Sequence, residues 1–172
     1  VYVKRSPGDN INSLIEGWGK PDEFATWAEA LPDAVRVENG RFRQWCFFLS
    51  DGWRRYLEAS VEHVAAFQYK AMNQAILDAK LAIPAEQWVE VFYEDFLRAP
   101  VPTFRRIFEA CDLRFDARLE RHCAEVLEIP YNAFSEIRLD KWKDGRNREK
   151  VERVLPQVAA VAAQMGYHVA GV

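Results

Sequence analysis

The sequence predicts an α/β domain that is rich in helix and contains a short parallel sheet. Two runs of β-branched and aromatic residues, 1–5 and 88–92, have the composition of short strands that are buried on both faces. The residues between them carry mostly helical patterns, and a helical crossover joins parallel strands. Because two strands do not make a stable sheet, we expect this sheet to need more strands than the chain supplies.

Composition sets the class of protein. The chain has 172 residues, of which 49% are hydrophobic and 13% aromatic, so it is long and apolar enough for one globular domain. Its net charge of -3 argues against bulk binding of nucleic acid, and no apolar run approaches the roughly 20 residues of a membrane span. Three cysteines without CxxC spacing favour a reducing cytoplasm, and no His/Cys cluster has the spacing of a metal site.

The first elements follow from turn signals and helical spacing. After the strand at 1–5, the stretch Ser-Pro-Gly-Asp predicts a turn, and a helix then runs to about Trp18 with an apolar residue at each helical repeat. A second helix is predicted for 23–31, where it ends before a proline. The aromatic-rich and arginine-rich stretch 33–59 is predicted to be loop with short helices.

The clearest helix begins at Ser60 and has an apolar stripe over about 20 residues. The charged triplet Tyr-Glu-Asp, 93–95, lies at the C-terminal end of the strand at 88–92. Further helices are expected over 100–113, 116–129 and 148–167. The proline within 148–167 should kink or divide the last of these helices.

Three segments resemble sulfotransferases that use 3′-phosphoadenosine 5′-phosphosulfate (PAPS). "YVKRSPGDNINSLIEGW" at 2–18 is similar to the strand, turn and helix in which an Arg precedes a Ser by eight residues. The stretch 81–113, "LAIPAEQWVEVFYEDFLRAPVPTFRRIFEACDL", resembles the later strand that ends in Tyr-Glu-Asp. The segment 141–167, which starts "KWKDGRN", resembles the C-terminal part of bacterial members. The resemblance implies a P-loop nucleoside-triphosphatase-like fold of three layers.

The resemblance also implies a nucleotide site with PAPS as donor and adenosine 3′,5′-bisphosphate as product. Arg5 and Ser13 would hold the 3′-phosphate, because a phosphate suits a planar cation with several donors and a nearby hydroxyl. Tyr93 would lie near the adenine. The simpler alternatives are a surface arginine, a helix serine and a core aromatic residue.

A basic segment near the C-terminus completes the predicted site. Arg138, Lys141 and Trp142 resemble the family's last motif, in which cations and a Trp close over the nucleotide. The glycine spacing differs from the family pattern, since Gly145 follows the Trp. The alternative is the solvated, charged start of a helix.

One family element has no counterpart in the sequence. The strand, loop and helix that hold the 5′-phosphosulfate lie upstream in the family, and no GxxxxGK[ST] motif occurs here. We therefore interpret 1–172 as a single, partial sulfotransferase-like domain without that first strand and loop. We expect this chain alone not to catalyse transfer, and the catalytic residues stay unassigned. We also expect the edge of the strand at 1–5 to favour a homo-oligomer or pairing with the absent half.

Two other functions are open at this point. The predicted reaction is transfer of a sulfuryl group to a hydroxyl or amine of a small acceptor whose identity the sequence does not specify. The first alternative is a helix-rich binding domain without catalysis, which the missing P-loop and the amphipathic helix after Ser60 favour. The second is another nucleotide-binding α/β transferase such as a small-molecule kinase, although a Walker lysine is missing.

Overall fold

A computed structural model describes residues 1–26, 31, 33–128 and 136–169. Its two strands, β1 (Tyr2–Lys4) and β2 (Glu90–Phe92), pair in parallel, with Tyr2 opposite Glu90 and Lys4 opposite Phe92. The predicted parallel pairing is therefore confirmed. Both strands are shorter than predicted, and within the described residues the sheet has these two strands.

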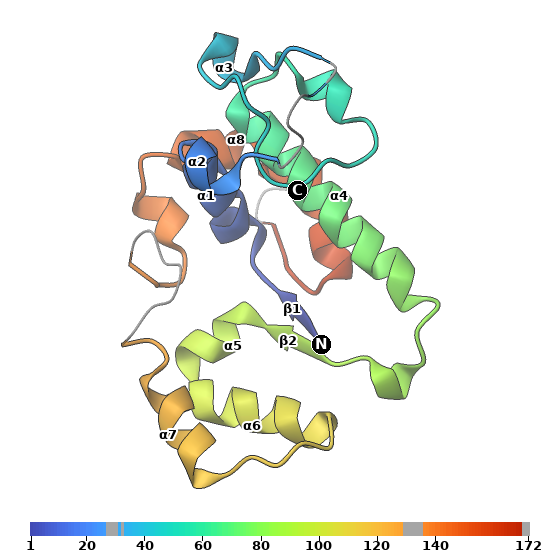
Figure 1. The fold of residues 1–172 in the computed structure, drawn as a ribbon, viewed down its shortest axis with the longest axis vertical. Helices are drawn as coiled ribbons and strands as arrows, with labels where there is room; N and C mark the ends of the chain where they lie inside the picture. The colour runs from blue at the N-terminus through green and yellow to red at the C-terminus, as the bar shows by residue number, and fades with distance from the viewer. Residues whose placement is uncertain (27–30, 32, 129–135, 170–172) are drawn as a thin grey trace.

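Three helices form the main core above the strands in Figure 1. They are α1 (Pro7–Trp18), α4 (Val61–Lys80) and α8 (Arg148–Gln164), and each packs against the other two. Their inner faces bury apolar side chains at helical spacing, including Ile11 on α1, Val64 on α4 and Val154 on α8. The helices predicted to end at Trp18 and to begin at Ser60 are confirmed.

A second group of helices lies on the other side of the strands (Figure 1). α5 (Tyr93–Arg98), α6 (Pro100–Ala110) and α7 (Ala117–Glu125) follow β2 directly and pack in sequence order. The triplet Tyr-Glu-Asp thus begins a helix instead of ending a strand. The rings of Phe96 and Phe104 lie 4.8 Å apart between α5 and α6. Cys111, which the sequence places on the inner face of α6, is exposed.

Short elements connect these groups. They are α2 (Pro21–Phe24), α3 (Val37–Gly40), and the 3-10 turns η1 (Trp53–Tyr56), η2 (Ala85–Gln87) and η3 (Lys141–Asp144). The stretch 33–59 is loop with short helices, as predicted. The helix predicted for 23–31 is wrong in its described part: α2 ends at Phe24, and Ala25 instead forms an antiparallel bridge with Cys46. Residues 27–30 of that prediction lie outside the described part.

The last helix, α8, is not divided by its proline, although the sequence left that possibility open. Pro156 lies on the exposed face, while Val154 and Val158 on either side of it are buried in the core. Core packing on both sides of the proline offsets the lost helix hydrogen bond. No helix in the described ranges combines the length and the hydrophobicity that crossing a membrane requires.

Candidate functional site

The carboxyl ends of β1 and β2 bring two predicted site residues into contact. Arg5 directly follows β1, and Tyr93 directly follows β2. Because the strands are parallel and in register, their ends lie at the same edge of the sheet, where α/β proteins bind ligands. The guanidinium carbon of Arg5 lies 4.7 Å from the centroid of the Tyr93 ring. Two residues 88 positions apart, 93 minus 5, thus form one cation–π pair.

The Arg5 side chain keeps hydrogen-bonding capacity in this position. Its Nε is buried and has no hydrogen-bond partner among the described residues. The Arg5 carbonyl accepts a long hydrogen bond from the Tyr69 hydroxyl, at 3.5 Å. A buried donor without an acceptor is unfavourable, so this guanidinium would gain from an acceptor that a ligand brings.

The start of α1 is already occupied by carboxylates. The Ser6 amide donates to Glu94 at 2.8 Å, and the Ser6 hydroxyl donates to Asp9 at 3.2 Å. Glu94 and Asp9 therefore take the place that an anion would have at this helix N-terminus. A phosphate at this edge would meet the Arg5 side chain and not the Ser6 amide.

Ser13 lies further along α1 and is half-buried. No hydrogen bond or ion pair joins it to the other predicted site residues in the described part of the chain. Its proposed contact with a phosphate stays a prediction from the resemblance.

The basic segment is attached to α1 by Asp9. The Asp9 carboxylate accepts hydrogen bonds from the amides of Asp140, at 2.9 Å, and Trp142, at 3.5 Å. Asp140 has a positive φ of 55°, so the chain turns sharply there. The Trp142 indole lies against Gly8: a Cβ at Gly8 would be 2.2 Å from the indole Nε1. Only glycine permits this close packing.

Two further contacts extend the attachment along the same face of α1. Lys141 forms an ion pair with Glu16 at 3.0 Å, and the Asn147 amide donates to Asn12 at 3.0 Å. Together with Asp9, these α1 residues follow a helical i, i+3, i+7 spacing. The polar i, i+3, i+7 spacing on α1 is the signal in the sequence that could have indicated this attachment.

The predicted cations of this segment are paired with neighbouring carboxylates. Arg138 contacts Asp144 at 3.0 Å and Glu136 at 3.3 Å. Lys141, as noted, contacts Glu16. The structure therefore places Arg138 and Lys141 in ion pairs at the surface of the segment, and a phosphate would have to compete for them.

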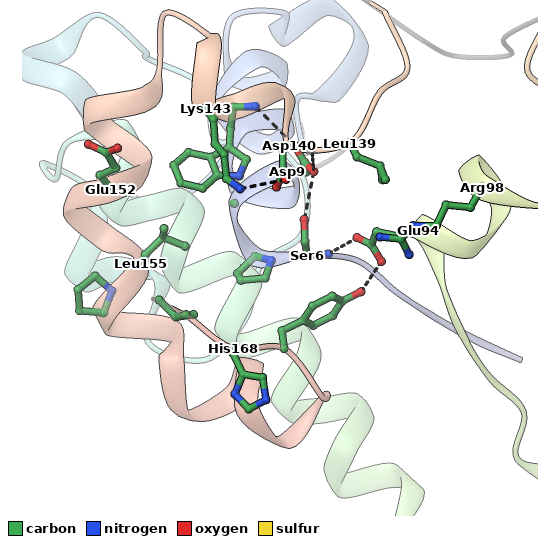
Figure 2. A pocket seen from close by; sticks show the side chains of 16 residues that line it. Ser6, Asp9, Glu94, Arg98, Leu139, Asp140, Lys143, Glu152, Leu155 and His168 are labelled. Atoms are coloured by element: carbon green, nitrogen blue, oxygen red, sulfur yellow. Dashed lines mark hydrogen bonds and ion pairs between the residues drawn. The ribbon is translucent and has the colours of Figure 1, made fainter. Parts of the chain in front are cut away.

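A cavity of about 610 Å³ lies between the start of α1, the segment 139–143, α8 and residues 167–169 (Figure 2). Trp142 is the one predicted site residue among its lining side chains. The Tyr167 hydroxyl donates to Glu94 at 2.7 Å on the wall of this cavity. Burial and, next, this hydrogen bond raise the pKa of Tyr167 well above its usual range. Glu94 thus joins the end of β2, the start of α1 and the C-terminal segment.

No metal site is formed by the described residues, since no three His, Cys, Asp or Glu side chains gather closely enough to hold an ion. The Ser60 hydroxyl and His63 Nδ1 are 2.7 Å apart at the start of α4, so His63 already has a hydrogen-bond partner within its own helix turn.

Comparison with known proteins identifies a family match. The model of a sulfotransferase family matches residues 33–117, a little under half of the chain. The matched stretch contains α4, β2 and the Tyr93 segment, whereas Arg5, Ser13 and the basic segment lie outside it. No curated protein and no solved structure matches the chain significantly. The resemblance to sulfotransferases predicted from the sequence is therefore confirmed over residues 33–117.

Proposed function

We propose that this chain is the nucleotide-binding part of a sulfotransferase that uses PAPS as donor and a hydroxyl or amine as acceptor. The family match supports sulfuryl transfer in general. The choice of PAPS is carried by one observation: the contact between Arg5 and Tyr93 at the carboxyl edge of the sheet.

The proposed contacts follow from this pair. Arg5 is held against the Tyr93 ring with its buried Nε unpartnered in the described structure, which suits a 3′-phosphate. The Tyr93 ring, which lies beside Arg5, would contact the adenine base. Ser13 would add a neutral hydroxyl donor to the phosphate.

PAPS would supply an activated sulfuryl group. This chain's residues would bind and orient the nucleotide end of the donor, and positioning of reactants can lower a barrier by about 7–11 kcal/mol. Arg5 would neutralise charge on the 3′-phosphate, away from the reacting sulfur. The base that takes the acceptor proton is not among the residues proposed here.

The test is a calorimetric titration with adenosine 3′,5′-bisphosphate and, separately, adenosine 5′-monophosphate. Wild-type protein should bind the bisphosphate more tightly. Arg5→Ala should weaken the bisphosphate by about 2–4 kcal/mol, because it removes a charge-assisted contact, and should affect the monophosphate much less. Arg121→Ala, an exposed arginine on α7, is the matched control and should change neither.

Equal losses for both ligands would contradict the assignment of Arg5 to the 3′-phosphate. If neither nucleotide binds to the wild-type protein, the non-catalytic binding domain becomes the better hypothesis. Preference for adenosine triphosphate with Mg²⁺ would favour the kinase alternative.

A further inference from the structure

The cavity beside the Arg5–Tyr93 pair has a wall of apolar side chains. Trp142, Leu155 and Pro156 line one side, and Leu139 and Val169 add further apolar surface. Figure 2 shows Leu155 on α8 at one side of the space, with Leu139 and Glu94 at the other side and Ser6 near its centre. Its volume of about 610 Å³ is in the range of small-molecule sites, which are mostly apolar with a few polar groups.

Two carboxylates in this cavity have no ion-pair partner among the described residues, although the N-terminus of α1 provides partial positive charge beside both. Asp9 is 5% exposed and Glu94 is 8% exposed, and both line the cavity. Their hydrogen bonds come from neutral donors: backbone amides, the Ser6 hydroxyl and the Tyr167 hydroxyl. Neither forms an ion pair with any described Lys, Arg or His. Buried carboxylates are usually paired with a cation, because an isolated buried charge is costly.

The other charged groups of the lining are accounted for in pairs. Lys143 contacts Asp140 at 2.9 Å, and Glu152 contacts Arg148 at 2.8 Å. Arg98 is exposed and lies 3.8 Å from Asp95. These pairs cancel, and the remaining titratable groups of the lining are the Tyr167 hydroxyl and the exposed His168. The cavity therefore has an excess of two negative charges, those of Asp9 and Glu94.

The chemistry of the lining thus defines a ligand class. The Trp142 indole offers an aromatic surface, with the Lys143 ammonium already 5.9 Å from the ring centroid, and such a ring attracts both a flat apolar body and a cation. Carboxylate oxygens accept more than one hydrogen bond each, so Asp9 and Glu94 can receive ammonium donors while keeping their present partners. We propose that this cavity is a binding site for a small organic cation, an aromatic amine whose ring packs on Trp142 and whose ammonium faces Asp9 and Glu94.

This proposal is independent of the sulfotransferase reaction, because it depends on the cavity and not on Arg5. Its first test uses three probes of similar shape: 2-phenylethylamine, the neutral 2-phenylethanol and the anionic 3-phenylpropanoate. Binding is followed by the shift of the Trp142 indole N–H in ¹⁵N-labelled protein, assigned with Trp142→Phe. The amine should bind on the order of tenfold more tightly than the alcohol, and the anion should bind least.

The second test changes charge at the cavity without touching the buried carboxylates. Pro156 lines the cavity, is exposed and lies inside α8, so Pro156→Ala, Pro156→Lys and Pro156→Glu should all fold. Compared with the alanine variant, lysine should weaken the amine about two- to fivefold and glutamate should strengthen it by a similar factor. Pro102→Lys, at an exposed position on α6, is the control and should have no effect.

Four results would overturn the proposal. The first is tighter binding of 3-phenylpropanoate than of 2-phenylethylamine. The second is a Trp142 indole signal that no probe shifts. The third is a 2-phenylethylamine affinity that does not decrease from Pro156→Glu to Pro156→Ala to Pro156→Lys. Displacement of the amine by adenosine 3′,5′-bisphosphate would also overturn it, since the cavity would then belong to the nucleotide.

Discussion

The guanidinium of Arg5 lies 4.7 Å above the ring of Tyr93 and joins the end of β1 to the start of α5. This contact links the two halves of the predicted nucleotide site. The contact with the ring holds the Arg5 guanidinium in place, although its Nε has no hydrogen-bond partner among the described residues.

Tyr93 supplies the first prediction. Tyr93→Leu removes the aromatic face under Arg5, so adenosine 3′,5′-bisphosphate should bind about 1–2 kcal/mol more weakly. Tyr93→Phe keeps the ring and should stay within about 0.5 kcal/mol of wild type. Calorimetry measures both variants. Equal affinities for the leucine and phenylalanine variants would show that the ring has no part in nucleotide binding.

Tyr167 supplies the second prediction. Tyr167→Phe leaves the buried Glu94 without one donor, so the free energy of unfolding should fall by about 1–3 kcal/mol at neutral pH. Chemical denaturation measures this loss. The exposed His168→Ala, next to it in sequence, is the control and should change stability by less than about 0.5 kcal/mol.

The same contact gives the protein a dependence on alkaline pH. The pKa of Tyr167 is raised in the folded state, and burial raises the pKa of Tyr2 to about 12. Above pH 10 the unfolded chain loses these protons first, so stability should be complete below pH 10 and should fall as pH rises from there. Each proton contributes a slope of about 1.4 kcal/mol per pH unit. Tyr167→Phe should make the slope shallower; an unchanged slope would be the contrary result.

Glu90 at the strand pair supplies the third prediction. Its carboxylate contacts Lys4 at 2.9 Å and Lys80 at 2.6 Å, and accepts a hydrogen bond from the Trp88 indole. Burial alone would raise the pKa of Glu90, but these hydrogen bonds outweigh it and lower the pKa to about 2. The stabilisation is therefore complete above the ordinary value of 4.5 and is lost as pH falls toward 2.

Glu90→Gln tests this directly. It should reduce the free energy of unfolding by about 2 kcal/mol at neutral pH, partly because the buried Lys4 loses its partner. The difference from wild type should shrink in acid. Glu23→Gln, which affects an exposed pair with Lys20 at 3.7 Å, should cost less than about 0.5 kcal/mol. A constant difference across the acid range would argue against the lowered pKa.

Gly8 supplies the fourth prediction. Gly8→Ala favours helix by about 0.5–1 kcal/mol, but its Cβ would collide with the Trp142 indole. Overpacking of this kind costs about 1–3 kcal/mol, so the variant should be less stable, and amide exchange in 140–145 should become faster. In a Trp142→Ala background the same change should be neutral or stabilising. Destabilisation in both backgrounds would show that the close contact is not its cause.

The local elements were predictable because their signals are local. The helix that ends at Trp18, the helix after Ser60 and the parallel pairing of two short strands follow from apolar spacing, turn residues and the need for a crossover. The Arg5 and Tyr93 assignments came from the resemblance, and the register of the strands then explains why the two residues meet.

Only the tertiary structure decided which side chains share a site. Trp142 lies against Gly8, and Glu94 joins three segments that are far apart in the sequence, because packing and not periodicity brings them together. The same applies to charge: Arg138 and Lys141 were predicted to face a phosphate, but neighbouring carboxylates pair with both. A sequence shows which charges exist, whereas burial and distance decide which of them, such as Asp9 and Glu94, have no ion-pair partner in the described part of the chain.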